Sequence, residues 1–500
     1  MKIEDIITKI EKQDSISIDE SFSFAKNTSI LLRNDESNGR KIIIYVLDNW
    51  KKIPNETVEI WTDLIESAGF YPYLEKEKDN LKFINLAGKI RKNCHFSENI
   101  IPKENEKYFL HEEQKYLKSI LESGQNLIVS APTSFGKSLL IEEMVASNKY
   151  KNILIIQPTL ALLDETRKKL KKYQDNYRMI IRTSQESSKD KGNLFLLTAE
   201  RVMEYKNLPM IDFFVIDEFY KLSAKRDDER SDVLNNAFYK LLQQNQVPQF
   251  YLLGPNIDDI SKGFTNKYNA TFYKTNYSLI ENKVEDIYSM HKDKFKEPRK
   301  YKEFKEEKLF ELLFDLIDQQ SIIYCSSPSR VRDLAEKYCL FLINKQIEKS
   351  GDLPLIEWIK ENINSKWNLI TFLNYGIGIN DGALQKHINS SIIDSFNDKK
   401  LKYIFCTSTI IEGVNTSAKN VIYFDHTKGK NKKIDYFDYS NIKGRSGRMM
   451  IHYIGKIYNF NQPPEKSKKM TVDIPFYQQD PIKDEVLNGL NDSDIKTTVK

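Results

Sequence analysis

The sequence is poor in the features that mark secreted, membrane-embedded or metal-stapled proteins. Its four cysteines, Cys94, Cys325, Cys339 and Cys406, are scattered without CxxC spacing, so we expect neither a disulfide framework nor a zinc site. No apolar run is long enough to span a membrane, and the N-terminal stretch lacks the apolar core of a signal peptide. These absences predict a soluble, cytoplasmic protein with reduced thiols and no membrane contact.

The chain also lacks a strong charge of either sign and any repeat of solenoid or propeller period. Its 76 Lys and Arg residues against 71 Asp and Glu residues leave a net charge of only +5. A surface for nucleic acid would therefore be a local basic patch and not a field over the whole protein. The 500 residues, 40% of them hydrophobic, suffice for roughly two to four domains with real cores.

Hydrophobic patterning divides the chain into a helical start and two α/β regions. Amphipathic helical patterns fill the first hundred or so residues, and short apolar runs then alternate with helical patterns, interrupted by the charged stretch 291–308. That stretch is a solvated helix face or a nucleic-acid contact. Apolar strands separated by helices predict parallel sheets covered on both faces. The predicted parts are a helical accessory region, a first α/β domain, a linker, a second α/β domain and a polar tail, at 1–108, 109–282, 283–307, 308–462 and 463–500.

A phosphate-binding loop is predicted at residues 131–138, APTSFGKS, between an apolar strand and a helix. Backbone amides of the loop and the helix N-terminus would offer positive partial charge to phosphates. Lys137 would reach the β- and γ-phosphate oxygens, the Ser138 hydroxyl would bind Mg²⁺, and Gly136 removes a side chain where the loop turns most tightly.

Two adjacent carboxylates, Asp217 and Glu218, end the later apolar strand FFVID. At the carboxyl edge of a parallel sheet they are expected to face the same crevice as the phosphate loop. Asp217 would hold Mg²⁺, and Glu218 would orient and deprotonate the attacking water. The sequence therefore predicts hydrolysis of a nucleoside triphosphate.

With these two motifs the chain resembles the superfamily 2 helicases, and among them the Ski-like branch of DExH-type enzymes. The resemblance covers about residues 109–460 and implies two tandem RecA-like domains, each a parallel sheet flanked by helices, that close on ATP and Mg²⁺. It further implies that Thr133 and Ser134 of the loop contact ATP. Gln114, upstream of the loop, matches the glutamine that recognises adenine in this superfamily.

Further segments resemble the motifs with which these helicases contact the nucleic-acid backbone. QPTLALLDET resembles motif Ia, TAERV motif Ib, SIIYCSS motif IV and TSTIIEGVN motif V. Contacts to phosphates carry no sequence information, so we expect binding without sequence preference and with strong salt dependence. The residues that the resemblance assigns to these contacts are Pro158, Thr159, Thr198, Arg201, Ser326, Ser327, Thr407 and Ser408.

The second α/β region also carries residues that the resemblance assigns to the nucleotide. Gly413 and Asn415 of motif V would approach it. The segment GRSGR repeats motif VI, and its arginines, Arg445 and Arg448, are expected on one face of a helix. Both guanidinium groups would then reach the γ-phosphate as arginine fingers and stabilise charge in the transition state.

Several positions depart from the family pattern. Phe219 and Tyr220 follow the motif II carboxylates where relatives carry a coupling histidine or aspartate, and motif III reads Gly-Pro-Asn at 254–256. Motif VI begins with Asn441 where relatives have glutamine. The residues after motif VI are too few for the winged-helix and ratchet domains of the Ski-like branch, so strand separation is done differently or the chain is a fragment.

Two functional hypotheses follow, and a P-loop kinase is excluded because it has no use for motifs V and VI. The first is an ATP-dependent helicase or translocase that tracks a single strand, by analogy 3′ to 5′, on single-stranded or tailed duplex nucleic acid, with DNA favoured over RNA. The second is a nucleic-acid-stimulated ATPase that senses or scaffolds and gates a partner such as a nuclease. The N-terminal region and compact core resemble helicases of bacterial defence systems, which points to antiviral defence or genome maintenance.

Overall fold

A computed structural model of the chain describes residues 2–102, 107–223, 230–294, 298–349, 353–409, 416, 418–429, 432–466 and 469–478. Its contacts group the chain into two compact units, and neither unit is continuous in sequence. Unit 1 contains Met1–Lys89, Thr133–Phe135 and Ser278–Ser467, and unit 2 contains Ile90–Pro132, Gly136–Tyr277 and Lys468–Lys500.

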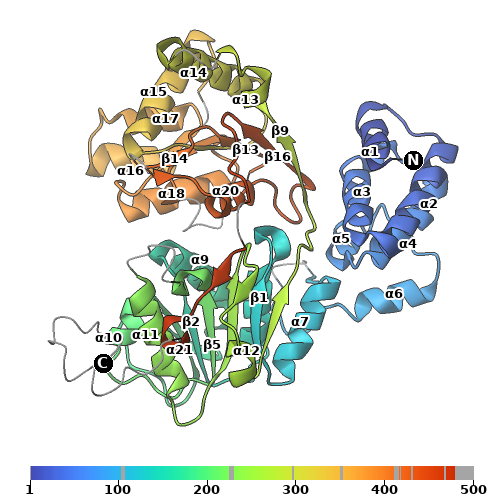
Figure 1. Cartoon of the computed structure of the whole chain (residues 1–500). Coiled ribbons are helices and arrows are strands. Elements are labelled where there is room, and N and C mark those ends of the chain that lie inside the picture. Colours follow the sequence, from blue (N-terminus) through green and yellow to red (C-terminus); the bar gives the residue numbers. More distant parts are fainter. Residues whose placement is uncertain are drawn as a thin grey trace. The chain divides into compact units, whose positions relative to one another are not determined.

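Unit 2 is built on a seven-stranded sheet in which every neighbouring pair of strands is parallel (Figure 1). The central strands are continuous apolar runs that are buried on both sides, as a helix-covered parallel sheet requires. In sheet order the strands are β3 (Tyr177–Ile180), β4 (Gly192–Leu197), β2 (Asn152–Ile156), β5 (Phe213–Asp217), β6 (Gln249–Gly254), β1 (Asn126–Ser130) and β8 (Ala270–Lys274).

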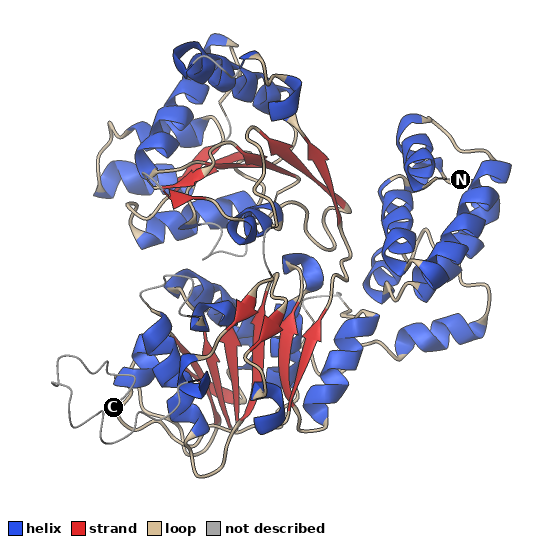
Figure 2. Ribbon diagram, viewed as in Figure 1, coloured by secondary structure: helices blue, strands red, loops and turns tan. Residues whose placement is uncertain are grey.

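Helices flank this sheet and connect its strands (Figure 2). Two of them begin with a side-chain cap, which satisfies an amide that the first helical turn leaves unpaired. The helices are α7 (Glu112–Glu122), α8 (Lys137–Ala146), α9 (Leu160–Leu170), α10 (Ala199–Glu204), α11 (Ser231–Leu242) and α12 (Phe264–Lys267), with short 3₁₀ turns η4 (Lys171–Tyr173) and η5 (Phe219–Leu222).

The C-terminal part of the chain adds a strap to unit 2. Strand β17 (Thr471–Val472) pairs in parallel with β7 (Asp259–Ile260), and helix α21 (Pro475–Gln478) follows it. Val472 and Ile474 are fully buried, and the Phe476 ring packs edge-on against Phe238 at 5.4 Å between centroids. Part of the segment predicted as a polar tail thus contributes apolar side chains to the core of unit 2.

Unit 1 contains a six-stranded sheet that is also parallel throughout. In sheet order its strands are β11 (Ile377–Asn380), β12 (Tyr403–Cys406), β10 (Ser321–Tyr324), β13 (Asn420–Tyr423), β16 (Ile454–Asn459) and β9 (Glu281–Glu285). A small antiparallel pair, β14 (Thr427–Lys428) and β15 (Lys432–Lys433), follows β13. The helices that follow β9 in this part of unit 1 are α13 (Ile287–Met290), α14 (Pro298–Asp315), α15 (Pro328–Asn344), α16 (Pro354–Asn362), α17 (Asn368–Asn374), α18 (Lys386–Asn397) and α20 (Tyr436–Lys443).

The segment predicted as a linker, 283–307, is structured. Most of β9 lies in it, and β9 pairs with β16 as the edge strand of the second sheet. Helix α14 begins within the same segment, and its charged residues Lys305 and Glu306 are buried inside unit 1. A charged stretch can therefore belong to a core when each charge finds a partner there.

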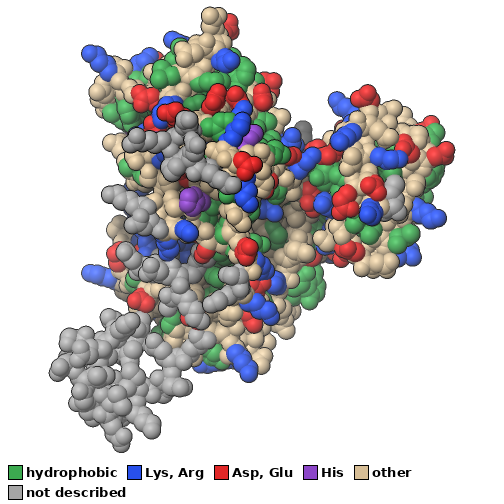
Figure 3. Space-filling view, turned by 45° about the horizontal axis from the view of Figure 1, so that its top comes forward, with side chains coloured by type: hydrophobic (Ala, Val, Ile, Leu, Met, Phe, Trp, Pro, Cys, Tyr) green, Lys and Arg blue, Asp and Glu red, His purple; other side chains and the backbone are tan. Residues whose placement is uncertain are grey.

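The N-terminal helical region, residues 2–89, also belongs to unit 1. Its helix α3 packs against β9 and β16. On the face of this region that Figure 3 shows, positive and negative side chains lie interspersed. The elements are α1 (Ile3–Lys12), α2 (Ile18–Asn34), α3 (Glu36–Asp48), η1 (Trp50–Lys52), η2 (Asn55–Thr57), α4 (Val58–Ser67) and α5 (Tyr71–Lys76), and α6 (Leu86–Asn93) continues into unit 2. Two parallel sheets flanked by helices, preceded by a helical region, confirm the predicted fold class.

Candidate functional site

The predicted phosphate loop connects β1 to α8. Gly136 adopts the left-handed conformation with φ of 79°, which a residue without Cβ reaches at low cost, and α8 begins at the next residue. The Lys137 side chain is 9% exposed, and its ammonium donates to the carbonyls of Ala131 at 2.7 Å and Pro132 at 3.0 Å. Thr133 and Ser134 form the turn η3 (Thr133–Phe135), and Ser138 is exposed in the first turn of α8. A lysine held over its own loop beside a helix N-terminus is suited to receive phosphates.

Gln114 is fully buried, and it is tied to the phosphate loop. Its side-chain amide donates to the Gly136 carbonyl at 3.2 Å, and its oxygen accepts from the His111 amide at 3.1 Å. The His111 ring caps α7 and stacks on Tyr277 with 4.6 Å between ring centroids. Sequence reasoning missed His111 and Tyr277, although the spacing of His111 and Gln114 matches a capping box.

Two buried carboxylates fix the helix that follows the loop. Glu143 forms an ion pair with Lys118 at 2.5 Å and accepts from the Asn99 amide at 2.9 Å. Glu142 forms ion pairs with Lys169 at 2.8 Å and Lys172 at 2.7 Å. Burial raises the pKa of Glu142, but the two lysines outweigh it and lower the pKa below its usual value. The middle of α8 is therefore held in place from two sides.

The predicted catalytic carboxylates lie at the end of β5, where Asp217 is the last residue of the strand and Glu218 follows it. The Gln157 side chain, at the end of the neighbouring strand β2, donates to Asp217 Oδ2 at 3.1 Å, and Thr166 donates to Gln157 Oε1 at 2.8 Å. The Glu218 amide donates to Asp217 Oδ1 at 3.0 Å, and Glu218 itself has a φ of 58°. That left-handed conformation costs a residue other than glycine about 1 kcal/mol or more. Both oxygens of Asp217 are thus oriented, and sequence reasoning missed the roles of Gln157 and Thr166.

The residues of motifs II and III that differ from the family pattern pack against each other in the structure. Phe219 is fully buried, and a Cβ added to Gly254 would lie 3.3 Å from its Cδ1 atom and 2.9 Å from Ile257 Cδ1. The glycine that begins motif III therefore makes room for the aromatic ring that follows the motif II carboxylates. Tyr220 is buried as well, so both aromatic residues are part of the core of unit 2.

The residues that the resemblance assigns to nucleic acid in unit 2 lie at helix starts. The Thr159 hydroxyl caps α9 by accepting from the Leu162 amide at 3.3 Å, and Thr198 is the N-cap residue of α10. The Arg201 guanidinium donates to the Ile181 carbonyl at 2.8 Å, and the Pro158 carbonyl accepts from Arg230 at 3.0 Å. Helix starts offer amides to a phosphate, but the contacts themselves stay predictions.

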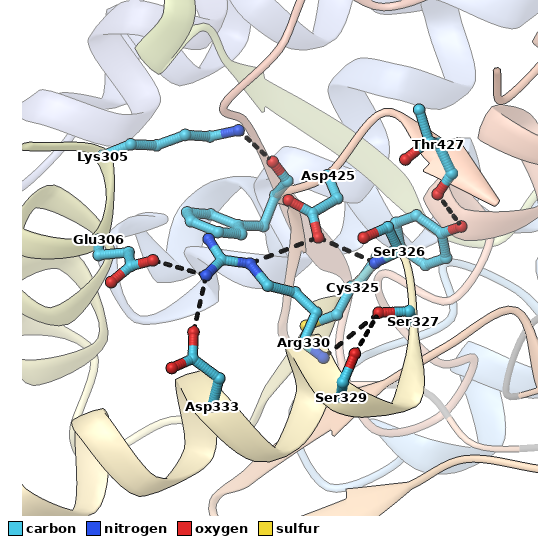
Figure 4. A network of polar contacts seen from close by, with 12 residues as sticks. Lys305, Glu306, Cys325, Ser326, Ser327, Ser329, Arg330, Asp333, Asp425 and Thr427 are labelled. Atoms are coloured by element: carbon cyan, nitrogen blue, oxygen red, sulfur yellow. Dashed lines mark hydrogen bonds and ion pairs between the residues drawn. The ribbon is translucent and has the colours of Figure 1, made fainter. Parts of the chain in front are cut away.

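In unit 1, Ser326 and Ser327 follow β10 and lie in the polar network of Figure 4. The Ser326 amide donates to Asp425 at 2.9 Å, and the Ser327 hydroxyl caps α15 by accepting from the Arg330 amide at 3.3 Å. Arg330 forms ion pairs with Glu306 at 2.5 Å and Asp333 at 2.9 Å.

Lys305 lies at the edge of the same network and is 5% exposed. Its ammonium donates to the Asn461 side chain at 3.2 Å and lies 4.5 Å from the centroid of the Phe424 ring. Burial lowers the pKa of Lys305 to about 8, against the opposing effect of Asp425. The network joins α14, β10, β13 and α15, and so fixes the loop that carries both serines.

Motif V begins at the end of β12. Thr407 is buried, its amide donates to the Asn380 carbonyl at 3.1 Å, and its hydroxyl lies 3.2 Å from that of Thr409. Ser408 is partly exposed beside it. Gly413 and Asn415 lie outside the described residues.

The prediction that Arg445 and Arg448 share a helix face is wrong. Helix α20 ends at Lys443, and both arginines follow it in a looped segment. Gly447, between them, has a φ of 78°, and its amide donates to the Ala418 carbonyl at 2.8 Å. A helix cannot continue through this bend, because Ser446, next to the glycine, forms a bridge with Ala418 before β13. The assignment of the two arginines to the γ-phosphate stays a prediction.

Comparison with known families identifies three matches along the chain. The Anti-bacteriophage protein B N-terminal domain matches residues 1–85. The DEAD/DEAH box helicase family matches residues 112–252, and the Helicase conserved C-terminal domain matches residues 305–450. These ranges contain the phosphate loop and carboxylates in one case and motifs IV to VI in the other.

Individual relatives are longer than this chain. Anti-bacteriophage protein B of Escherichia coli (strain K12) is 34% identical over 91% of this chain and 60% of its own length. Human Helicase POLQ-like is 23% identical over 70% of this chain and 35% of its own length. ATP-dependent DNA helicase Hel308 of Thermoplasma volcanium is 24% identical over 69% of this chain and 51% of its own length. Among the described residues, no helix is long and apolar enough to cross a membrane.

Proposed function

We propose that this chain, which belongs to the superfamily 2 helicases and is homologous to the Hel308 and POLQ-like enzymes, is an ATP-dependent helicase or translocase. Its substrate is single-stranded or tailed duplex nucleic acid. DNA is favoured over RNA, because several relatives are named as DNA helicases. By analogy with the family, movement is 3′ to 5′.

The helicase domains imply ATP binding, and the residues around the loop fit that ligand. Lys137 would exchange the carbonyls of Ala131 and Pro132 for phosphate oxygens, which are stronger acceptors because they are charged. Gln114 would recognise adenine from its buried place beside Gly136. The hydroxyl of Ser138 and the oriented carboxylate of Asp217 would hold Mg²⁺, a cation that prefers oxygen ligands.

Hydrolysis would depend on few groups, because phosphoryl transfer needs in-line geometry and charge stabilisation more than covalent help. Glu218 would orient the attacking water and accept its proton. Arg445 and Arg448 would stabilise the charge on the γ-phosphate in the transition state. Helix starts and hydroxyls of motifs Ia, Ib, IV and V would grip successive phosphates of the tracked strand.

One observation carries this proposal, namely the way unit 2 orients Asp217 and Lys137. Four hydrogen bonds hold these side chains in place: Asp217 accepts from Gln157 and from the Glu218 amide, and Lys137 donates to two loop carbonyls. Thr166 in turn holds Gln157. A buried lysine and an oriented carboxylate at the carboxyl ends of strands in one parallel sheet are what triphosphate hydrolysis requires.

The proposal is tested by strand separation. Purified chain is mixed with ATP, Mg²⁺ and duplexes that carry a 3′ tail, a 5′ tail or no tail, in DNA and in RNA, and ATP turnover is measured in the same tubes. We expect the 3′-tailed DNA duplex to be unwound faster than the others. Turnover stimulated by single strands without strand separation would contradict the helicase assignment.

That last outcome would support a second function, a nucleic-acid-stimulated ATPase that gates a partner such as a nuclease. It is favoured by the match of residues 1–85 to the Anti-bacteriophage protein B N-terminal domain. The similarity to Anti-bacteriophage protein B over 91% of the chain supports a role in antiviral defence for either function.

A further inference from the structure

The loop that follows the second motif VI arginine is held in an unusual backbone conformation. After Arg448 the chain turns back, because the amides of Ile451 and His452 both donate to the Arg448 carbonyl, at 3.0 and 2.8 Å. Met450, within this turn, has a φ of 70°, in the left-handed region that residues with a Cβ rarely adopt. We call residues 448–453 the finger loop. Such a conformation persists only where its surroundings hold it.

On one side the finger loop is held by the second sheet. Tyr453 leads directly into β16, and its carbonyl accepts from the Glu281 amide of β9 at 2.9 Å. The backbone before the loop is packed even more closely, because a Cβ added to Gly455 would lie 2.6 Å from the Gly447 amide nitrogen. The sheet thus fixes both ends of the finger loop.

On the other side the finger loop is held by α5 of the N-terminal helical region. The Tyr73 side chain is fully buried, and its hydroxyl donates to the Leu279 carbonyl. Burial raises the pKa of Tyr73, so this hydroxyl stays protonated and can keep donating. The Tyr73 hydroxyl thus joins α5 to the segment before β9, and the first residue of β9, Glu281, is bonded to the finger loop at Tyr453.

Three more contacts join α5 and the residue after it to Tyr453. The rings of Tyr73 and Tyr453 meet edge to face with 4.8 Å between centroids. The Tyr453 hydroxyl donates to Glu77 at 2.5 Å, and the Lys76 ammonium lies 3.9 Å from the centroid of the Tyr453 ring. A cation over an aromatic face and an edge-to-face ring pair are both attractive.

More distant contacts hold the same helical region on the same sheet. Glu11 of α1 forms an ion pair with Lys283 of β9 at 3.0 Å, and Asp48 of α3 lies 3.8 Å from Lys419. These pairs are partly exposed and contribute little energy each. The buried tyrosine contacts are therefore the main link between the helical region and the finger loop.

We propose that Tyr73 and Tyr453 are positioning residues for hydrolysis, through which the N-terminal helical region sets the backbone that carries Arg448. This inference rests on the proposed function, because it takes Arg448 as an arginine finger. The N-terminal helical region, which carries no catalytic motif, would then control hydrolysis. A ligand or movement that displaces α5 would alter ATP turnover.

The experiment uses the full chain with Tyr73→Phe, which removes the hydroxyl but keeps the ring. Tyr453→Phe is the second variant, because it removes the bond to Glu77 at the edge of the same contact. Tyr45→Phe is the matched control, since Tyr45 is a buried tyrosine of α3 without a described contact to the finger loop. Each variant is compared with the unsubstituted chain by ATP turnover and by hydrogen exchange of the peptide that covers residues 446–454.

We expect Tyr73→Phe to lower kcat about three- to tenfold, the effect of losing one neutral hydrogen bond, with KM for ATP unchanged. Amides of the finger loop should exchange faster in Tyr73→Phe and in Tyr453→Phe, and at the same rate as in the unsubstituted chain in Tyr45→Phe. In an Arg448→Ala background, Tyr73→Phe should cause no further loss of kcat, because the group being positioned is gone.

Unchanged exchange of the finger loop in Tyr73→Phe would overturn the inference without touching the proposed function. The same proportional loss of kcat with and without Arg448 would also overturn it, because a general loss of structure acts regardless of that arginine. Absence of ATP turnover in the unsubstituted chain would instead contradict the proposed function, and with it the finger that these residues are inferred to position.

Discussion

Glu218 is the residue whose substitution separates binding from hydrolysis. Its left-handed backbone and the bond from its amide to Asp217 fix its place beside the proposed ligand of Mg²⁺, so a glutamine of the same shape should leave the site intact. Glutamine cannot accept a proton from water at neutral pH. We expect Glu218→Gln to bind ATP as the unsubstituted chain does and to lose about 100-fold or more in kcat.

Equilibrium binding of a fluorescent ATP analogue and steady-state turnover measure the two effects. Glu204→Gln is the matched control, since Glu204 is an exposed carboxylate at the end of α10 in the same unit. Normal turnover in Glu218→Gln would refute the assignment of the base.

Arg448 is expected to act on the transition state more than on the bound nucleotide. Removal of an interaction that forms mainly in the transition state lowers kcat with little effect on ground-state affinity. Arg448→Ala should therefore lose kcat by about 100-fold or more, within the range known for arginine fingers, while the affinity for ATP stays within about twofold. Equal loss of both, in the same binding and turnover assays, would argue against a finger.

For individual residues, the sequence predicts those whose role follows from local spacing, and it misses those that act through tertiary contacts. The strand, glycine, lysine and helix of the phosphate loop are neighbours in sequence, so their arrangement could be derived. Gln157 orients Asp217 across two adjacent strands that are 60 residues apart in sequence, and no local pattern reports that. The arginines of motif VI were misplaced on a helix because spacing alone does not show that Gly447 bends the chain.

Among the elements, the strap formed by β17 and α21 is expected to stabilise unit 2. Val472 is fully buried, whereas its neighbour Thr471 is exposed. A carboxylate forced into the place of Val472 would lose its hydration without gaining a partner, a cost on the order of 3 kcal/mol. We expect Val472→Asp to lower the thermal unfolding midpoint of unit 2 and Thr471→Asp to leave it nearly unchanged.

Differential scanning calorimetry of both variants tests this expectation. The two variants carry the same added carboxylate, at a buried position in one and at the exposed neighbouring position in the other. Equal midpoints for Val472→Asp and the unsubstituted chain would show that the strap contributes nothing to stability. The element could not be predicted from sequence, because its few apolar residues, such as Val472, Ile474 and Phe476, lie in a polar region after residue 463 that otherwise indicates a tail.

The finger loop should make the stability of unit 1 depend on acid pH through His452. Burial, followed by the nearby charges of Lys419, Lys399, Lys76 and Arg448, lowers the pKa of His452 to about 4. The folded state then stays neutral at His452 while the unfolded state takes up a proton below its ordinary pKa of 6.5. The stability that comes from keeping His452 neutral in the folded state is therefore intact above pH 6.5, and it is lost as pH falls toward 4.

Denaturant unfolding of the unsubstituted chain and of His452→Asn between pH 4 and 8 measures the effect, since asparagine does not titrate. The stability difference between the two should be constant above about pH 6.5 and should shift against the unsubstituted chain as the pH falls. A difference that does not change with pH would contradict the assigned burial of His452.

For the whole molecule, alternating apolar runs and helical patterns were sufficient to predict two parallel sheets, because buried strands need helices on both faces. They did not predict which helices and strands group together. The N-terminal helical region and the second sheet form one unit although more than 180 residues separate Lys89 from Ser278. Their contacts, such as Tyr73 with Leu279, join residues 206 positions apart in sequence and carry no periodic signal.

The central claim is that ATP turnover depends on the phosphate loop and is stimulated by nucleic acid. The direct test is steady-state ATP hydrolysis by the purified chain, with and without single-stranded DNA or RNA, beside Lys137→Ala. We predict turnover that rises with single-stranded DNA and is abolished together with ATP binding in Lys137→Ala. Turnover that survives in Lys137→Ala, or a chain that hydrolyses no ATP with either polymer, would contradict the account.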